Sequence, residues 1–121
     1  MNVSFKGFGE QILTFETEAE LKAGVPVKVT DSGKVAACGD GEVFAGFTAA
    51  PSREGLAAVQ VGGYVCVKYS GTAPAFNRTL VAADASGGIK AAAAAEGKTA
   101  AGREVLVAEL DSAGGYVGII L

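Results

Sequence analysis

The feature that most constrains this chain is the recurrence of short runs of β-branched and aromatic residues, each ended by Gly, Asp, Ser or Pro. Runs of this kind, bounded by turn-forming residues, are typical of β-strands. The sequence therefore predicts an all-β fold. We expect a small single-domain β-barrel or tulip-like β-sandwich, with short connectors and at most one short helix.

The hydrophobic pattern locates the expected strands. The longest run covers residues 56–69. Gly62 and Gly63 within it predict a turn, a bulge or a sharp corner, so this run is two strands or one bent strand. Thr17 and Glu20 have the spacing of a capping box, but the segment 17–24 has room for only one or two helical turns and is predicted to be a connector. The expected strand regions are 3–8, 11–16, a hairpin over 24–38, 42–50, 56–69, a hairpin over 79–93, 104–110 and 116–121.

The length of 121 residues is that of one domain. We divide it into an N-terminal strand or arm segment, 1–23, and a β-domain, 24–121. Two stretches resemble each other, VKVTDSGKVAA at 27–37 and LVAADASGGIKAA at 80–92, since each places an Asp/Ser/Gly turn between two strands. Both an internal duplication and a chance likeness between two hairpins are compatible with this pattern.

The composition excludes several classes of function. The chain has no His, so a Ser-His-Asp triad, a Cys-His pair and an HExxH zinc site are all impossible. Its ten basic residues are scattered along the chain and are outnumbered by thirteen acidic ones, which argues against a nucleic-acid partner. No apolar run has the length of a signal sequence or a membrane span, so no membrane partner is expected.

The candidate chemical groups favour ordinary structural roles. Asp40 and Glu42 could bind a cation together, but solvated turn charges explain them better, since no further ligands lie at a suitable spacing. Cys66 would need a base to act as a nucleophile, and only Lys68 lies on the same strand face. Cys38 and Cys66 are expected to be buried free thiols, although a single disulfide bridge between them remains possible. No catalytic residue, metal ligand or cofactor is predicted.

The residues by themselves support a structural or binding module. A partner can bind such a module by adding a strand at a sheet edge or through a terminal arm. The N-terminal segment is the best candidate, because its aromatic residues alternate with glycines. The predicted partner-binding residues are Asn2, Val3, Ser4, Phe5 and Phe8.

The chain resembles the head decoration, or capsid cement, proteins of tailed bacteriophages. The resemblance covers 24–121 and rests on soft β-patterns, namely GVPVKVTDSGKVAA, VFAGFTAAP, AAVQVGGYVCVKYSG, TLVAADASGGIKAA and the closing GYVGIIL. The best-known members of this family carry an extended polar N-terminal tail, whereas the N-terminus here is short and strand-like.

This resemblance implies a β-rich virion protein, made in the host cytoplasm, that binds the outside of the expanded capsid. It implies the major capsid protein as partner, assembly as a homotrimer, and no enzyme activity, cofactor or DNA contact. Two other classes remain open, namely another phage structural component such as a tail or fibre-base domain, and a small enzyme or carrier. The enzyme or carrier would have its site in a loop such as 70–78 or 94–103.

Overall fold

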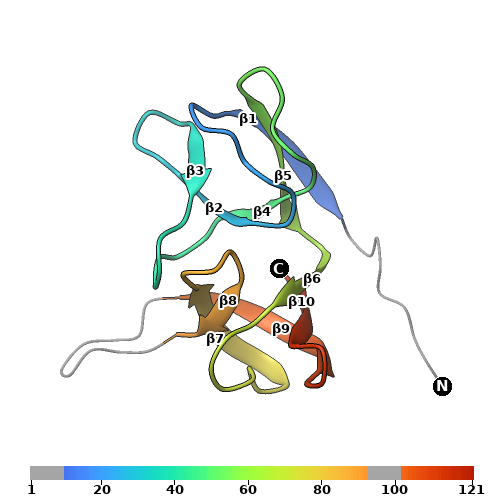
Figure 1. Cartoon of the computed structure of the whole chain (residues 1–121). Coiled ribbons are helices and arrows are strands. Elements are labelled where there is room, and N and C mark those ends of the chain that lie inside the picture. Colours follow the sequence, from blue (N-terminus) through green and yellow to red (C-terminus); the bar gives the residue numbers. More distant parts are fainter. Residues whose placement is uncertain (1–9, 93–101) are drawn as a thin grey trace.

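The computed structural model describes residues 10–92 and 102–121, and within them the protein is all-β, without a helix (Figure 1). Nearly all of the strands lie in segments for which the alternation of apolar residues predicts a strand. The described residues form ten strands: β1 (Gln11–Glu16), β2 (Pro26–Val29), β3 (Val35–Ala37), β4 (Gly46–Thr48), β5 (Leu56–Gly62), β6 (Tyr64–Lys68), β7 (Asn77–Ala83), β8 (Ile89–Ala91), β9 (Arg103–Asp111) and β10 (Tyr116–Ile120).

The strands form two five-stranded sheets that have the same topology. Sheet A has the order β1-β5-β4-β2-β3 and sheet B has the order β6-β10-β9-β7-β8, with every ladder antiparallel. Adding five to each label of sheet A gives the order of sheet B. The first half of the chain therefore builds one sheet, the second half builds the other in the same way, and Figure 1 shows them stacked.

The hairpins that resemble each other in sequence occupy equivalent places in the two sheets. In the β2–β3 hairpin the Thr30 N–H donates to the Lys34 carbonyl at 2.7 Å, and in the β7–β8 hairpin the Asp84 N–H donates to the Gly88 carbonyl at 3.0 Å. Each turn also contains a glycine with positive φ, 80° in the first and 84° in the second, which glycine adopts without steric cost. These glycines are Gly33 and Gly87. The likeness of the two hairpins thus extends to their hydrogen bonds.

Each sheet curls until its two edges meet at one point. A single parallel bridge joins Thr17 to Val35 in the first half, and the equivalent bridge joins Tyr69 to Ile89 in the second. Among the residues that the structure describes, nothing else joins these edges, so the sheets are not closed into a barrel and the fold is sandwich-like. The all-β prediction is therefore confirmed, with the barrel alternative excluded.

Each curled sheet encloses its own apolar core. The core of the first half consists of Leu21, Val27, Val35, Ala57 and Val59. The core of the second half contains seven buried residues of sheet B, Val67, Val81, Ile89, Val105, Val107, Val117 and Ile119, and also Phe44 and Phe47 from the first half. The two phenylalanine rings lie 4.8 Å apart between centroids. The first half therefore completes the core of the second.

A guanidinium group also connects the halves. Arg103, at the start of β9, donates hydrogen bonds to the carbonyls of Ala45 and Val61, the latter at 3.0 Å, and lies 6.0 Å from the centroid of the Phe44 ring. Its partial burial lowers the pKa of the guanidinium below its usual value. Two backbone hydrogen bonds support the junction, since Ala83 in β7 exchanges N–H and carbonyl contacts with the loop that precedes Phe44.

The structure corrects one sequence prediction and confirms two others. The strand predicted over 42–50 is limited to β4, because the loop before it contacts β7 and supplies Phe44 to the other core. The run 56–69 is two strands in different sheets, joined at Gly63, which has φ 86°. The segment 17–24 is a connector without a helix, as predicted, and the Thr17 hydroxyl bonds to the backbone of Ala19.

Asp84 provides a test of the second hairpin. This buried carboxylate accepts hydrogen bonds from Ser70 Oγ and from the N–H groups of Ser86 and Gly88, each at 2.8 Å. Burial alone would raise its pKa, but these hydrogen bonds outweigh burial and hold the pKa below its usual value. Asp84→Asn is expected to lower the free energy of unfolding by about 1.5–3 kcal/mol in urea denaturation.

The pH dependence follows from the sign of this shift. Because the folded-state pKa of Asp84 is lowered, its contribution is present above the unfolded value of about 3.9 and is lost as the pH falls through the folded value. The difference between wild type and Asp84→Asn should therefore shrink in acid. Asp31→Asn, in the exposed turn of the other hairpin, is the control and should change stability by less than about 0.5 kcal/mol. Equal effects of the two variants would contradict this role.

Arg103→Met should weaken the junction between the halves. It keeps much of the side-chain length but leaves two carbonyls in the junction without their donors, so we expect a loss of about 2 kcal/mol or more in the free energy of unfolding. Arg53→Met, at an exposed arginine whose side chain makes no hydrogen bond or ion pair in the described part of the chain, is the matched control. Chemical denaturation followed by circular dichroism measures both, and a neutral Arg103→Met would disprove the assignment.

Candidate functional site

The predicted partner-binding residues lie just before the first strand. Asn2, Val3, Ser4, Phe5 and Phe8 fall outside the described residues. The described chain starts at residue 10 and leads directly into β1, which forms one edge of sheet A and pairs only with β5. The N-terminal segment is thus connected to an exposed edge strand, which is the sheet feature to which a partner strand can add.

The register of β1 shows which backbone groups are free. The Thr17 N–H donates to the Gly55 carbonyl, so alternate residues before Thr17 direct their backbone groups toward β5. Ile12 and Thr14 lie between these residues and direct their N–H and C=O groups away from the sheet. Among the described residues nothing pairs with these groups. They form a short backbone template for an added strand.

Apolar side chains flank this template. Ile12 is 45% exposed and Leu13 is 52% exposed, on opposite faces of β1. Proline, lysine, inward-pointing charges and β-bulges are the devices that usually protect an edge from pairing. Strand β1 contains no proline or lysine, and its register shift lies at its start, between Gln11 and Ile12. The exposed edge of β1 therefore has both the backbone groups and the apolar contacts for strand addition.

The other sheet edges are less open. Strands β3 and β8 contain only three residues each. Strand β6 is equivalent to β1 in sheet B, but the Gln60 side chain donates to the Tyr64 carbonyl at 2.9 Å and occupies one end of its edge. The sequence pattern identified strand addition as a means of binding. It could not identify β1 as the most open edge, because this depends on which strands pair.

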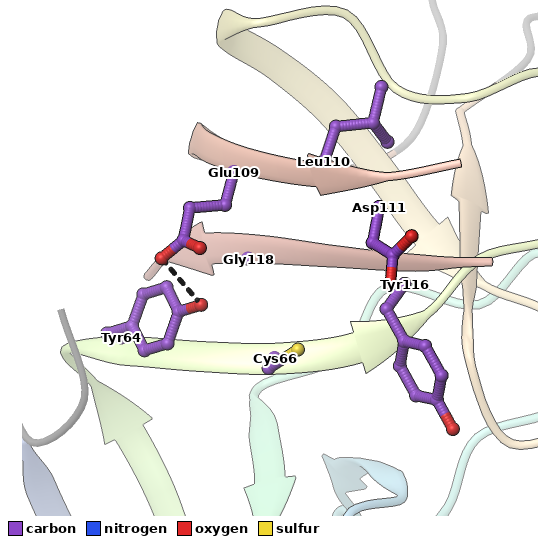
Figure 2. Close-up of a pocket in the computed structure, with 7 residues that line it drawn as sticks. All are labelled: Tyr64, Cys66, Glu109, Leu110, Asp111, Tyr116 and Gly118. Carbon is purple, nitrogen blue, oxygen red and sulfur yellow. Dashed lines mark hydrogen bonds between the residues drawn. The ribbon is translucent and has the colours of Figure 1, made fainter. Parts of the chain in front are cut away.

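Cys66 lies on the outer face of sheet B, in a shallow depression lined by two tyrosines and two acidic residues (Figure 2). The Tyr64 ring lies over Gly118, where a Cβ atom would clash with it, and its hydroxyl donates to Glu109 Oε1 at 3.1 Å. Partial burial and the nearby Glu109 carboxylate raise the pKa of the Cys66 thiol. The surroundings therefore favour the thiol over the nucleophilic thiolate.

The prediction that both cysteines are buried is wrong in part, although both are free thiols. Cys38 is half-buried and Cys66 is exposed, because Cys66 lies on the side of β6 that faces away from the core. Burial raises the pKa of the Cys38 thiol to about 11. Neither thiol has the lowered pKa of a catalytic cysteine.

The acidic pair predicted near Gly39 is engaged in ion pairs. Asp40 Oδ1 lies 2.8 Å from Lys90 Nζ, and Glu42 Oε2 lies 2.6 Å from Lys28 Nζ. The hydrogen bond from Lys28 lowers the pKa of Glu42, and the Gly39 N–H, which donates to the same carboxylate, adds to this effect. Both carboxylates thus lie in a loop and are paired with lysines, where the sequence predicted turn charges.

The two loops predicted as alternative sites give no catalytic arrangement in the part that is described. In the loop 70–78, Ser70 Oγ is engaged with Asp84, while most of 94–103 lies outside the described residues. In 10–92 and 102–121 no cluster of three or more His, Cys, Asp or Glu side chains could hold a metal ion. The same residues contain no helix with the length and hydrophobicity to span a membrane.

Comparison with known proteins does not assign the chain to a family. No protein-family model matches it, and no curated protein is significantly similar to it.

Titration of the two thiols tests whether their surroundings raise both pKa values. We expect both to titrate above the ordinary thiol value of about 8.5, with Cys38 near 11. The ultraviolet absorbance of the thiolate, followed against pH, measures this, and the variants Cys38→Ser and Cys66→Ser assign each transition. A Cys66 midpoint well below the ordinary value would contradict this description and would favour the enzyme alternative.

Proposed function

We propose that this protein is a structural virion component that binds the outer surface of the expanded phage capsid. In this role it stabilises the shell by bridging subunits of the major capsid protein. The observation that carries the proposal is the free edge of β1, with exposed Ile12 and Leu13, which follows directly on the N-terminal segment.

The edge provides a physical mechanism for binding. An extended segment of a capsid subunit would add to β1 through the outward N–H and C=O groups of Ile12 and Thr14, as in other cases of strand addition. The N-terminal segment, with Phe5 and Phe8, would supply a second contact on a neighbouring subunit. One copy would thereby hold two subunits together.

The stabilisation follows from mass action. A protein that binds only the expanded geometry lowers the free energy of that state by RT ln(1 + [L]/Kd) at every site. Many sites on one shell would together resist the pressure of the packaged DNA. The proposal includes assembly as a homotrimer on the capsid, synthesis in the host cytoplasm, and a function without a cofactor, nucleic acid or membrane.

Binding to capsids tests the proposal directly. Full-length protein is mixed with unexpanded and expanded capsids of the same source, and bound protein is measured by co-sedimentation. We expect saturable binding to expanded shells only, together with a higher rupture temperature of the shell. Binding to neither form, or an unchanged rupture temperature, would refute the proposed function. Electron microscopy of the bound protein would distinguish the capsid surface from a tail or fibre base.

Thr14→Pro tests the β1 edge. Proline lacks the outward N–H and is tolerated at an edge strand that does not use this group within its sheet. We expect capsid affinity to fall about tenfold or more, since an unmade hydrogen bond in an interface costs about 1–3 kcal/mol. Ile12→Lys, which places a charge beside the same backbone groups, should have a similar effect.

Cys66→Pro is the matched control, because Cys66 has the same place in β6 that Thr14 has in β1. Thr14 pairs with Ala58, and Cys66 pairs with Gly118. The control should bind capsids like wild type. If Thr14→Pro is folded and binds with unchanged affinity while wild type still binds expanded shells, the capsid function stands and the β1 edge is not its contact.

A further inference from the structure

The outer face of sheet B carries a small apolar and charged surface that the proposed capsid contact does not use. We name it the β7–β9 face and define it by Arg78, Leu80, Glu104 and Leu106. Side chains alternate between the two sides of a strand. The core side of β7 and β9 is occupied by Thr79, Val81, Val105 and Val107, so the four residues of the β7–β9 face lie on the opposite side. Leu80 is 38% exposed and Leu106 is 39% exposed.

The internal repeat indicates what such a face does. Leu80 occupies the place of Pro26 in the first half, since Cys38 N–H donates to the Pro26 carbonyl and Ala92 N–H donates to the Leu80 carbonyl. Across the β9–β10 ladder Leu106 pairs with Ile120 as Phe47 pairs with Gln60 in sheet A. Across the β7–β9 ladder the register differs from the first half, because Phe47 is opposite Pro26 whereas Glu104 is opposite Leu80.

In the first half this face is covered. Pro26 and Phe47 are both buried, and Phe47 belongs to the core of sheet B. In the second half Leu80 takes the place of Pro26, and the residue opposite it is Glu104. Leu106 lies two residues farther along the same face of β9, and nothing within the described residues covers this face. The repeat thus buries one copy of this face inside the molecule and leaves the other copy in contact with solvent.

The four side chains form a self-complementary pattern. Arg78 lies opposite Leu106 and Leu80 lies opposite Glu104 across the β7–β9 ladder. The leucines therefore occupy one diagonal and the charged residues the other, with Arg78 Nη1 2.8 Å from Glu104 Oε1. Both charged side chains are largely exposed, at 75% and 55%, so both can reach a second molecule.

We propose that the β7–β9 face binds the same face of a second copy of this chain, forming a two-fold symmetric contact. A two-fold axis along the leucine diagonal would place leucines against leucines and Arg78 of one copy against Glu104 of the other. A two-fold axis parallel or perpendicular to the strands would instead place a charged side chain against a leucine. An axis along the charged diagonal would place Arg78 against Arg78 and Glu104 against Glu104. The strands of the two sheets would then cross steeply, as in orthogonal sheet packing.

This contact is independent of the β1 edge, which lies in the other sheet. A copy that binds the capsid through its β1 edge and N-terminal segment would still have its β7–β9 face free to bind another copy. On a shell it would connect neighbouring copies by a two-fold contact, in addition to any three-fold assembly. The proposal does not require the capsid function to be correct.

Sedimentation velocity of the full-length protein, over a wide range of concentration, tests the contact. We expect a reversible monomer–dimer equilibrium, and a rise of about tenfold or more in the dimer Kd for Leu106→Lys. Val29→Lys changes a residue of similar exposure, 46%, in sheet A and should leave the equilibrium unchanged. Circular dichroism verifies that both variants are folded.

A charge exchange isolates the pairing across the contact. Arg78→Glu should weaken the dimer, and the double variant Arg78→Glu with Glu104→Arg should restore it, while thermal stability of the monomer changes little because the pair is exposed. A monomer at every concentration would overturn the proposal. An unchanged dimer in Leu106→Lys, or a dimer that responds to Val29→Lys instead, would assign self-association to another face and also overturn it.

Discussion

The contact between the Arg103 guanidinium and the backbone of the other half is the interaction on which the arrangement of the two sheets depends. Two curled sheets of small side chains have few bulky groups to fix their mutual position. Arg103 reaches two carbonyls of the first half, and Phe44 packs beside it while completing the second core. A planar group with several donors suits this place, because two carbonyls, one in the loop before β4 and one in β5, need donors in one fixed geometry.

The repeat explains why the halves differ in their surfaces although they share a topology. Stacking covers the outer face of sheet A with sheet B, so Pro26 and Phe47 are buried, whereas Leu80 and Leu106 on the outer face of sheet B are exposed. The stacking also leaves the edge of β1 open. The equivalent edge of β6 is partly occupied, because the Gln60 side chain from β5 donates a hydrogen bond to the Tyr64 carbonyl. The two surfaces at which we propose binding, the β1 edge and the β7–β9 face, are thus parts of the repeat that no other described residue covers.

The fold class and most strands could be predicted from local patterns. Alternation of Val and Ile with polar residues predicted both hairpins, and their Asp/Ser/Gly turns lie where expected, with Gly33 and Gly87 at positive φ. The strand expected over 42–50 was too long, because Phe44 has the hydrophobicity of a strand residue but serves as a side-chain contact to the other half. Of the candidate site, the sequence indicated strand addition and the N-terminal segment. The particular edge depends on pairing between residues far apart in the chain.

The sequence by itself determined the local structure of this protein. The spacing of β-branched residues, the glycines in the turns and the absence of His fixed an all-β chain and excluded several kinds of catalytic site. Only the tertiary structure decided that the two similar hairpins belong to two sheets with one topology, that Cys66 is exposed, and that β1 and the β7–β9 face remain open. The physical reason is that alternation places a side chain on one side of a strand, but the stacking of the sheets decides which side is covered.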